Sequence, residues 1–182
     1  MSDLGSMFIE ETIRRFDEEY LPRLERAVAT LSPDQVWWRP HEETTSIANL
    51  LIHLEGNVRQ WFIGGLGEAS QKRERSAEFA AREGADGPTL CAALRRTVEE
   101  TYPILRTLDD AALAKTWTIQ GFEVSGLAAV YHVLEHFGWH TGQITWIAKS
   151  LGGPEHGIAF YDDESLGLDE ANDRERGAGD SS

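Results

Sequence analysis

Three histidines spaced four residues apart carry the clearest chemical meaning in this 182-residue chain. They are His132, His136 and His140, in an apolar stretch that is typical of a helix. Residues four apart lie on one face of a helix, so this face presents an imidazole on each of three turns. Imidazole is costly to bury without a partner and is the commonest metal ligand in proteins. The spacing therefore indicates a metal site.

A second histidine-bearing segment strengthens this interpretation. His53 lies in the middle of an apolar helix, where a single histidine is more often a hydrogen-bonded core residue than a ligand. Together with His136 and His140, however, it would complete the three-imidazole ligand set of an open catalytic site. His132 is the alternative to His140. Gln143 favours His140, because it returns to the same helical face and could hold the ring or a bound water.

Other polar side chains near these histidines are candidates for binding or catalysis. Asn57 lies one turn after His53 on the same helical face. Arg59 could meet an anionic substrate or form a surface salt bridge. Together with Gln143, these two residues are the candidate catalytic residues. A zinc-peptidase motif is not supported, because Phe137 occupies the place of the glutamate that acts as general base.

Four amphipathic segments predict an all-α fold, and helices of this number and length favour a four-helix bundle. Pro22 is expected to bend or split the first helix, and Ser46 to open the second. A charged loop with one helical turn around Phe79 is expected to join the second helix to the third. A β-rich stretch predicts a short hairpin before the fourth helix. The helices are expected at residues 3–31, 47–66, 90–108 and 125–151, and the hairpin at 115–124.

Composition indicates one soluble domain, expected at residues 1–160, and an acidic disordered tail at 161–182. The formal net charge is −14, which argues against nucleic acid as a partner because phosphate binding needs clustered basic residues. No apolar run is long enough to span a membrane and no signal peptide is evident, so we expect a cytoplasmic protein that binds no membrane. The single cysteine, Cys91, excludes a cysteine-only metal site.

Four segments carry a recognisable set of motifs: Trp38-Arg39-Pro40, the run from Ser46 to Asn57 with Arg59 and Trp61, Gln120-Gly121, and His136-x-x-x-His140-x-Gly142-Gln143-Ile144. Together they resemble the DinB/YfiT-like superfamily, and most closely its DUF1572 branch. The resemblance implies four helices in up-down-down-up order with one long crossover, and many relatives are dimers, so a homodimer is expected. It also implies a divalent metal held by His53, His136 and His140, with zinc or nickel as the main expectation and iron or manganese as alternatives.

The same resemblance implies a class of chemistry. Relatives with known activities include transferases and isomerases that use low-molecular-weight thiols such as mycothiol or bacillithiol. We therefore expect a metal-dependent enzyme that activates such a thiol for transfer to a small electrophile, since a coordinated thiol loses its proton. Two alternatives stay open: a hydrolase using water activated by the metal, and a non-catalytic stress or binding protein that the metal stabilises. A closed site with His132 or Glu135 as a fourth ligand would favour the last.

Overall fold

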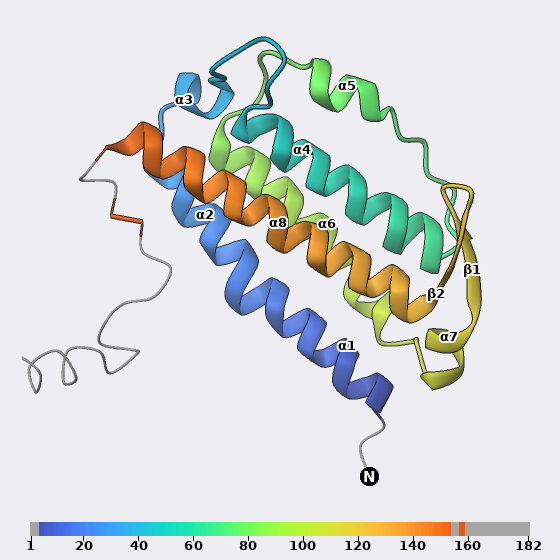
Figure 1. The fold of residues 1–182 in the computed structure, drawn as a ribbon. Helices are drawn as coiled ribbons and strands as arrows, with labels where there is room; N and C mark the ends of the chain where they lie inside the picture. The colour runs from blue at the N-terminus through green and yellow to red at the C-terminus, as the bar shows by residue number, and fades with distance from the viewer. Residues whose placement is uncertain (1–3, 154–156, 159–182) are drawn as a thin grey trace, which may run out of the picture.

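The computed structural model describes residues 4–153 and 157–158, and four helical rods dominate it (Figure 1). The first rod consists of α1 (Leu4–Arg14), the π-helical η1 (Arg15–Tyr20) and α2 (Leu21–Ala29). The second is α4 (Ile47–Val58), continued by the π-helical η2 (Arg59–Leu66). The third is α6 (Gly87–Leu105) and the fourth is α8 (Gly126–Gly152). The connecting elements are α3 (Pro33–Trp37), α5 (Arg75–Ala80), α7 (Asp110–Ala114), β1 (Thr116–Ile119) and β2 (Phe122–Ser125).

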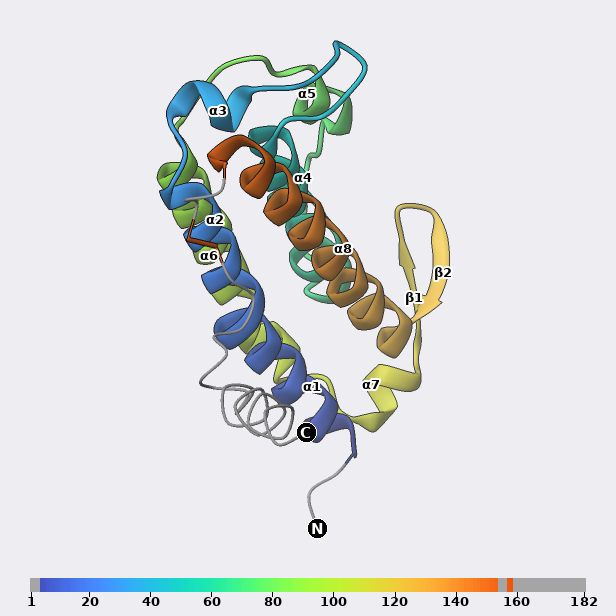
Figure 2. The same ribbon diagram turned by 60° about the vertical axis from the view of Figure 1, so that its left-hand side comes forward.

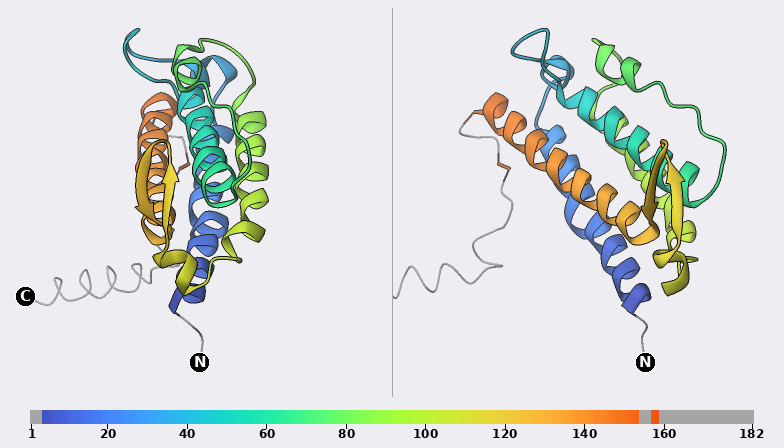
Figure 3. Two further views of the ribbon diagram at one scale, coloured as in Figure 1. Left: turned by 90° about the vertical axis from the view of Figure 1, so that its right-hand side faces the viewer. Right: turned by 45° about the vertical axis from the view of Figure 1, so that its right-hand side comes forward.

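The rods form the predicted bundle. The first and fourth rods run in one direction and the second and third in the other, as Figures 1 and 3 show. Helices α2 and α4 each pack against both α6 and α8. The long connection from η2 to α6 carries α5 back along the second rod to the end where α4 begins. This is an up-down-down-up arrangement with one long crossover, so the predicted all-α fold is confirmed.

Local sequence signals account for where the rods begin. Ser46 Oγ accepts a hydrogen bond from Asn49 N (3.2 Å) and Asn49 Oδ1 accepts one from Ser46 N (3.0 Å), a capping box that starts α4. Helix α6 begins three residues earlier than predicted, because Asp86 Oδ1 caps it by accepting from Thr89 N (2.9 Å). Pro22 does not interrupt the first rod. The helix widens into η1 just before Pro22 and continues through it as α2.

An aromatic cluster joins three of the rods at the centre of the core. Phe16 of the first rod meets Phe62 of the second with ring centroids 6.4 Å apart, and Phe137 of the fourth at 5.0 Å, both edge to face. All three side chains are fully buried. Such pairs contribute about 0.5–1.5 kcal/mol each beyond the area they bury. Phe137, which occupies the place of the glutamate of the zinc-peptidase motif, is thus a core residue, and this burial explains why the position is apolar.

A two-stranded antiparallel hairpin precedes α8, as predicted (Figure 2). Its two turn residues, Gln120 and Gly121, have φ angles of 55° and 82°, as expected for the tight turn that suits strand twist. The strands pair Thr116 with Ser125 and Ile119 with Phe122. Ser125 ends the hairpin and also caps α8, since its Oγ accepts from Ala128 N (3.1 Å). The hairpin therefore fixes where α8, the helix that carries three of the histidines, begins.

Two further expectations concern residues that the structure does not describe. The acidic tail predicted at 161–182 lies outside them, as does the C-terminal boundary expected at residue 160. Within the residues that are described, no helix is long and apolar enough to cross a membrane.

Candidate metal centre

Three histidines from two rods converge between α4 and α8. His53 comes from the middle of α4, while His136 and His140 lie one turn apart on α8. The Nε2 atoms of His53 and His136 are 2.9 Å apart. One ring nitrogen from each of the three histidines lies within 4.8 Å of those of the other two. The structure thus brings together the three side chains that the sequence pattern selects, in a group that could hold a metal ion.

His132, the alternative ligand, lies at the edge of this group. Its ring is tilted against Trp61, with centroids 4.2 Å apart, and stacks on His136 at 5.6 Å. It lines a separate surface hollow together with Trp61 and the β2 residue Val124. Among the described residues, the group able to hold a metal comprises His53, His136 and His140 without it. By this stacking, His132 packs against His136 and helps to orient the His136 ring.

A buried carboxylate orients His53 from behind. Glu78 Oε2 lies 2.9 Å from His53 Nδ1. Arg73 holds both oxygens of that carboxylate, with Nε 2.6 Å from Oε1 and Nη2 2.8 Å from Oε2. Burial acts to raise the pKa of Glu78, but the hydrogen bonds from Arg73 and His53 outweigh it and the pKa is lowered. Arg73 Nη2 also lies 3.0 Å from His53 Nδ1, but its two N–H groups have acceptors in Glu78 Oε2 and in the His53 carbonyl oxygen (3.3 Å). Because a carboxylate only accepts, the contact with Glu78 assigns the proton to Nδ1 of His53 and leaves the lone pair on Nε2.

The crossover segment that supplies Glu78 is tied to the second rod by hydrogen bonds with side chains of that rod. Asn49 Nδ2 donates to the carbonyl oxygens of Glu78 (2.8 Å) and Ala81 (3.1 Å). Gln60 Oε1 accepts from Arg73 Nη1 (2.8 Å) and also from Gln120 Nε2 at the hairpin tip. Asn49 and Gln60 therefore connect three separate parts of the chain around one imidazole. Asn49 thus supports the α5 segment, and Gln60 supports Arg73.

Gln143 performs a corresponding role on α8. Its Oε1 lies 2.6 Å from His140 Nδ1. An amide oxygen only accepts, so Nδ1 of His140 is the protonated nitrogen and Nε2 is available as a ligand atom. The one-turn spacing from which Gln143 was predicted to hold this ring is what allows the contact. Two of the three imidazoles are thereby fixed in the tautomer that metal binding needs.

The histidines face an open cavity of about 380 Å³. Its wall contains one cation, Arg75, whose guanidinium lies 4.9 Å above the Phe79 ring. Phe79 in turn packs on His53, with ring centroids 4.8 Å apart. None of the described residues that line the cavity is a carboxylate. The lining residues are Thr45, Leu50, His53, Arg75, Phe79, His136, Trp139, His140 and Gln143.

The chemistry of these donors fits a divalent cation. Burial lowers the pKa of His136 to about 3, and it also lowers the pKa of His53 and His140. The three rings are therefore neutral near pH 7, the form in which imidazole binds a metal. Metal–nitrogen bonds of about 2.0–2.1 Å allow two ligands of one ion to lie as close as the Nε2 atoms of His53 and His136 do.

Comparison with known proteins identifies the family. Residues 3–158 match a family described as "Protein of unknown function (DUF1572)". The chain belongs to the DUF1572 family. None of the curated proteins compared with it matches. The resemblance inferred from the motifs is therefore confirmed, although the family description carries no activity to transfer.

Solved structures place this DUF1572 protein among DinB-like folds. A DinB-like protein from Bacillus subtilis aligns with a TM-score of 0.59 at 19% identity, covering 80% of this chain and 94% of that one. A conserved protein from Enterococcus faecalis aligns at 0.65 with 14% identity, covering 82% and 97%. A DinB-like protein from Bacillus cereus aligns at 0.60 with 12% identity, covering 77% and 91%. At such identities the likeness shows the fold alone.

Two of the candidate catalytic residues lie away from the cavity. Arg59 bonds Glu55 Oε1 (3.1 Å) and Thr97 Oγ1 (2.8 Å), in a hollow on another side of α4. Asn57 is buried, does not line the histidine cavity, and its Oδ1 has no hydrogen-bond partner among the described residues. Gln143 alone of the three reaches both a histidine and the cavity.

Sequence reasoning missed three residues in the crossover: Arg73, Arg75 and Glu78. They belong to a charged stretch with no periodicity, where any carboxylate or guanidinium resembles a solvated surface group. The one available signal was Phe79, the apolar residue that predicted a helical turn there, which is now α5. A carboxylate directly before a buried-type residue in such a turn is a candidate for burial.

Proposed function

We propose that this protein is a divalent-metal-dependent enzyme in which His53, His136 and His140 hold the metal. It activates a low-molecular-weight thiol for transfer to a small electrophile. The observation that carries the proposal is the combination of three converging imidazoles with an open cavity beside them. Zinc and nickel suit an imidazole-only ligand set best, and iron is an alternative.

The residues that line the cavity favour a thiol over water as the nucleophile. A divalent ion held by the three rings would favour the thiolate form of a thiol that reaches it, which is the nucleophilic form. Hydrolysis would further need a general base near the reacting water. The described cavity wall offers no carboxylate, and Glu78 is engaged by His53 and Arg73 behind the site.

The residues around the histidines have separate tasks in this proposal. Glu78 and Gln143 hold the rings of His53 and His140 by their Nδ1 atoms. Arg75 lines the cavity and forms no ion pair with the described residues. It is therefore placed to bind a carboxylate of the thiol or of the electrophile. Arg75 takes over the part first considered for Arg59. During transfer the sulfur–carbon bond forms, the bond to the leaving group breaks, and the thiol proton passes to solvent.

A non-catalytic, metal-stabilised protein is the competing function, and the open cavity argues against it. Structural metal sites are usually closed by a fourth protein ligand. The two residues considered for that place are His132, which stacks against Trp61 and His136, and Glu135, which is exposed.

Metal analysis of single variants tests the ligand set. Protein purified without nickel affinity should contain a stoichiometric metal by mass spectrometry, and His53→Ala, His136→Ala and His140→Ala should each lose it. His132→Ala should retain it, as should the exposed-histidine control His41→Ala. Undiminished metal in any of the first three would contradict the assignment, and loss in His132→Ala would make His132 a ligand.

Activity assays test the reaction. The wild-type protein should catalyse transfer of mycothiol, bacillithiol or cysteine to iodoacetamide, with turnover abolished by a chelator and restored by added zinc or nickel. Arg75→Gln should raise KM for bacillithiol and cysteine, which carry carboxylates, while leaving metal content unchanged. A metal-loaded protein that transfers none of these thiols would favour the non-catalytic alternative.

A further inference from the structure

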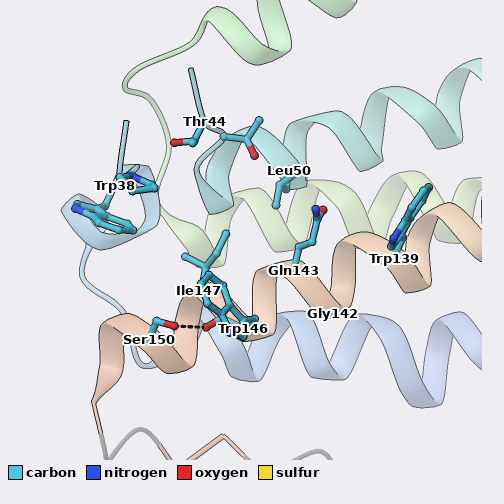
Figure 4. A pocket seen from close by; sticks show the side chains of 11 residues that line it. Trp38, Thr44, Leu50, Trp139, Gly142, Gln143, Trp146, Ile147 and Ser150 are labelled. Atoms are coloured by element: carbon cyan, nitrogen blue, oxygen red, sulfur yellow. Dashed lines mark hydrogen bonds between the residues drawn. The ribbon is translucent and has the colours of Figure 1, made fainter. Parts of the chain in front are cut away.

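A second cavity, larger and almost wholly apolar, opens beside the histidine cavity. It has a volume of about 630 Å³ and lies between the start of α4, the segment after α3 and the last turns of α8 (Figure 4). We call it the tryptophan groove. Its lining residues are Trp38, Pro40, Thr44, Thr45, Leu50, Trp139, Gly142, Gln143, Trp146, Ile147 and Ser150.

The groove and the histidine cavity adjoin each other and share part of their lining. Four residues, Thr45, Leu50, Trp139 and Gln143, line both. Gln143 bonds His140 through Oε1 and also forms part of the groove wall, between Leu50 and Trp139 in Figure 4. A molecule whose reactive atom lies at the histidines therefore has the groove beside it, across these four shared residues.

The chemistry of the wall selects the kind of group that fits. None of the described residues that line the groove is charged. Trp139 and Trp146 are 72% and 71% exposed, which leaves large apolar surfaces uncovered at the groove. Aromatic faces of this kind bind rings and alkyl chains by dispersion and burial. A volume of this size is in the range that holds small molecules.

A glycine keeps the middle of the groove open. A Cβ built at Gly142 would meet no atom within 4 Å, so the space above this helical position is empty. Glycine in a helix interior costs about 1 kcal/mol relative to alanine, and no close approach of another element requires it here. The absence of a side chain is thus what gives the groove its depth next to Gln143.

We propose that the tryptophan groove binds the uncharged, apolar part of the electrophile that reacts at the three histidines. This assignment of substrate class rests on the proposed function. The substrate then has two unlike ends: a reactive carbon at the histidines and an aromatic or aliphatic group between the tryptophans. The acidic segment 161–182 is a poorer occupant, because the groove presents no arginine or lysine to its carboxylates.

Filling the groove tests the proposal without disturbing the histidines. Gly142→Leu places a side chain in empty space, so the fold and the metal content should be preserved. The probe is N-phenyl-1-naphthylamine, an uncharged aromatic molecule whose binding quenches tryptophan fluorescence. The wild type should bind one probe molecule, and Gly142→Leu should weaken binding by about tenfold or more, since leucine covers the same apolar surface. Ala92→Leu, which adds a leucine at an exposed position of α6 outside the groove, is the matched control and should bind normally.

A matched pair of electrophiles links the groove to the reaction. N-benzyl iodoacetamide and iodoacetamide share the reactive carbon, but only the first carries a ring. Wild type should prefer the benzyl compound in kcat/KM, and Gly142→Leu should remove that preference, because the leucine occupies the place of the ring. Unchanged probe binding and unchanged preference in Gly142→Leu would overturn the groove assignment and leave the metal proposal standing. If the histidine variants instead keep their metal, the proposed function fails while probe binding still reports on the groove.

A second copy of the chain is the other occupant to exclude. If the wild type sediments as a dimer and Gly142→Leu as a monomer, the groove is an interface and the proposal is overturned. A sedimentation coefficient equal in both proteins supports a small-molecule site.

Discussion

Two arginines lie beside helix α4 and each bonds a glutamate, but their surroundings differ. Arg59 Nε lies 3.1 Å from Glu55 Oε1, with 40% of the arginine side chain and 26% of the glutamate exposed. Arg73 Nε lies 2.6 Å from Glu78 Oε1, with 9% of each side chain exposed. Water screens the first pair, so its attraction is weak. The second pair has little water to replace a lost partner, so each of its members depends on the other.

The comparison shows what makes a charged residue part of a site. Arg59 follows a histidine-bearing helix and is the natural candidate when only residue types and spacing are considered. Arg73 comes from a crossover with no periodicity, yet it holds the carboxylate that holds His53. Burial and connection to an imidazole distinguish the two, and both arise from tertiary packing. The predictions below test this difference, from the largest expected effect to the smallest.

Removing Arg73 should have the largest effect. Arg73→Met leaves Glu78 charged, buried and without its main partner, so the free energy of unfolding should fall by about 3–5 kcal/mol. Chemical denaturation of the two proteins measures this. The double variant Arg73→Met, Glu78→Leu should recover most of the loss, because it removes the uncompensated charge. A cost below about 1 kcal/mol for Arg73→Met would place the pair in the same class as Arg59–Glu55.

Neutralising Glu78 should weaken the metal site as well as the buried pair. Glu78→Gln keeps the shape of the side chain but accepts more weakly from His53 Nδ1, so metal affinity should fall by about 10–100-fold, the usual effect of losing such a supporting group. Competition with a chelator measures the affinity. Glu55→Gln is the matched control on the exposed pair and should bind metal like the wild type. Equal affinities in all three proteins would show that Glu78 does not support a metal ligand.

The extent to which the site was predictable follows from the same comparison. His53, His136 and His140 could be selected because helical spacing repeats and because a buried imidazole needs a partner. Gln143 followed from one-turn spacing to His140. Glu78 could not be selected, because its contact with His53 joins residues 25 apart through a segment with no periodic pattern. Local sequence records which face a residue occupies in a helix, but not which loop crosses that face.

The fold shows the same division between local and distant information. The rods, the hairpin and the turn around Phe79 were predictable, since periodicity, capping residues and a two-residue turn are local signals. The start of α6 was placed too late because Asp86 was not recognised as its cap. The short helix α7 was missed, since five residues show no periodicity. The tryptophan groove depends on the meeting of α4 and α8 and had no signal in either segment.

Gly56 tests how tightly the buried pair is packed. Replacing a helical glycine by alanine usually stabilises a helix by up to about 1 kcal/mol. At Gly56, however, the new Cβ would collide with Glu78 Oε1 and lie 2.8 Å from Arg73 Nε. We expect Gly56→Ala to lower stability by about 1 kcal/mol instead, since overpacking displaces the ion pair. Gly142→Ala, where nothing lies within 4 Å, should raise it. If thermal denaturation shows that both changes stabilise the protein, the Arg73–Glu78 pair can shift to make room for the new Cβ at Gly56 at little cost.

Replacing Arg59 should have the smallest effect, and it tests the other half of the comparison. Arg59→Met removes bonds to Glu55 and Thr97. Glu55 remains accessible to water, and the buried Thr97 Oγ1 still donates to Glu55 Oε1 (3.1 Å), so the free energy of unfolding should change by less than about 1 kcal/mol. High salt should reduce even this difference, because ions screen exposed charges. Metal content and thiol transfer should be those of the wild type, since Arg59 does not line the histidine cavity. A loss of several kcal/mol would mean that partial exposure does not weaken this pair. A loss of transfer activity with full metal content would restore Arg59 as a substrate-binding residue in place of Arg75.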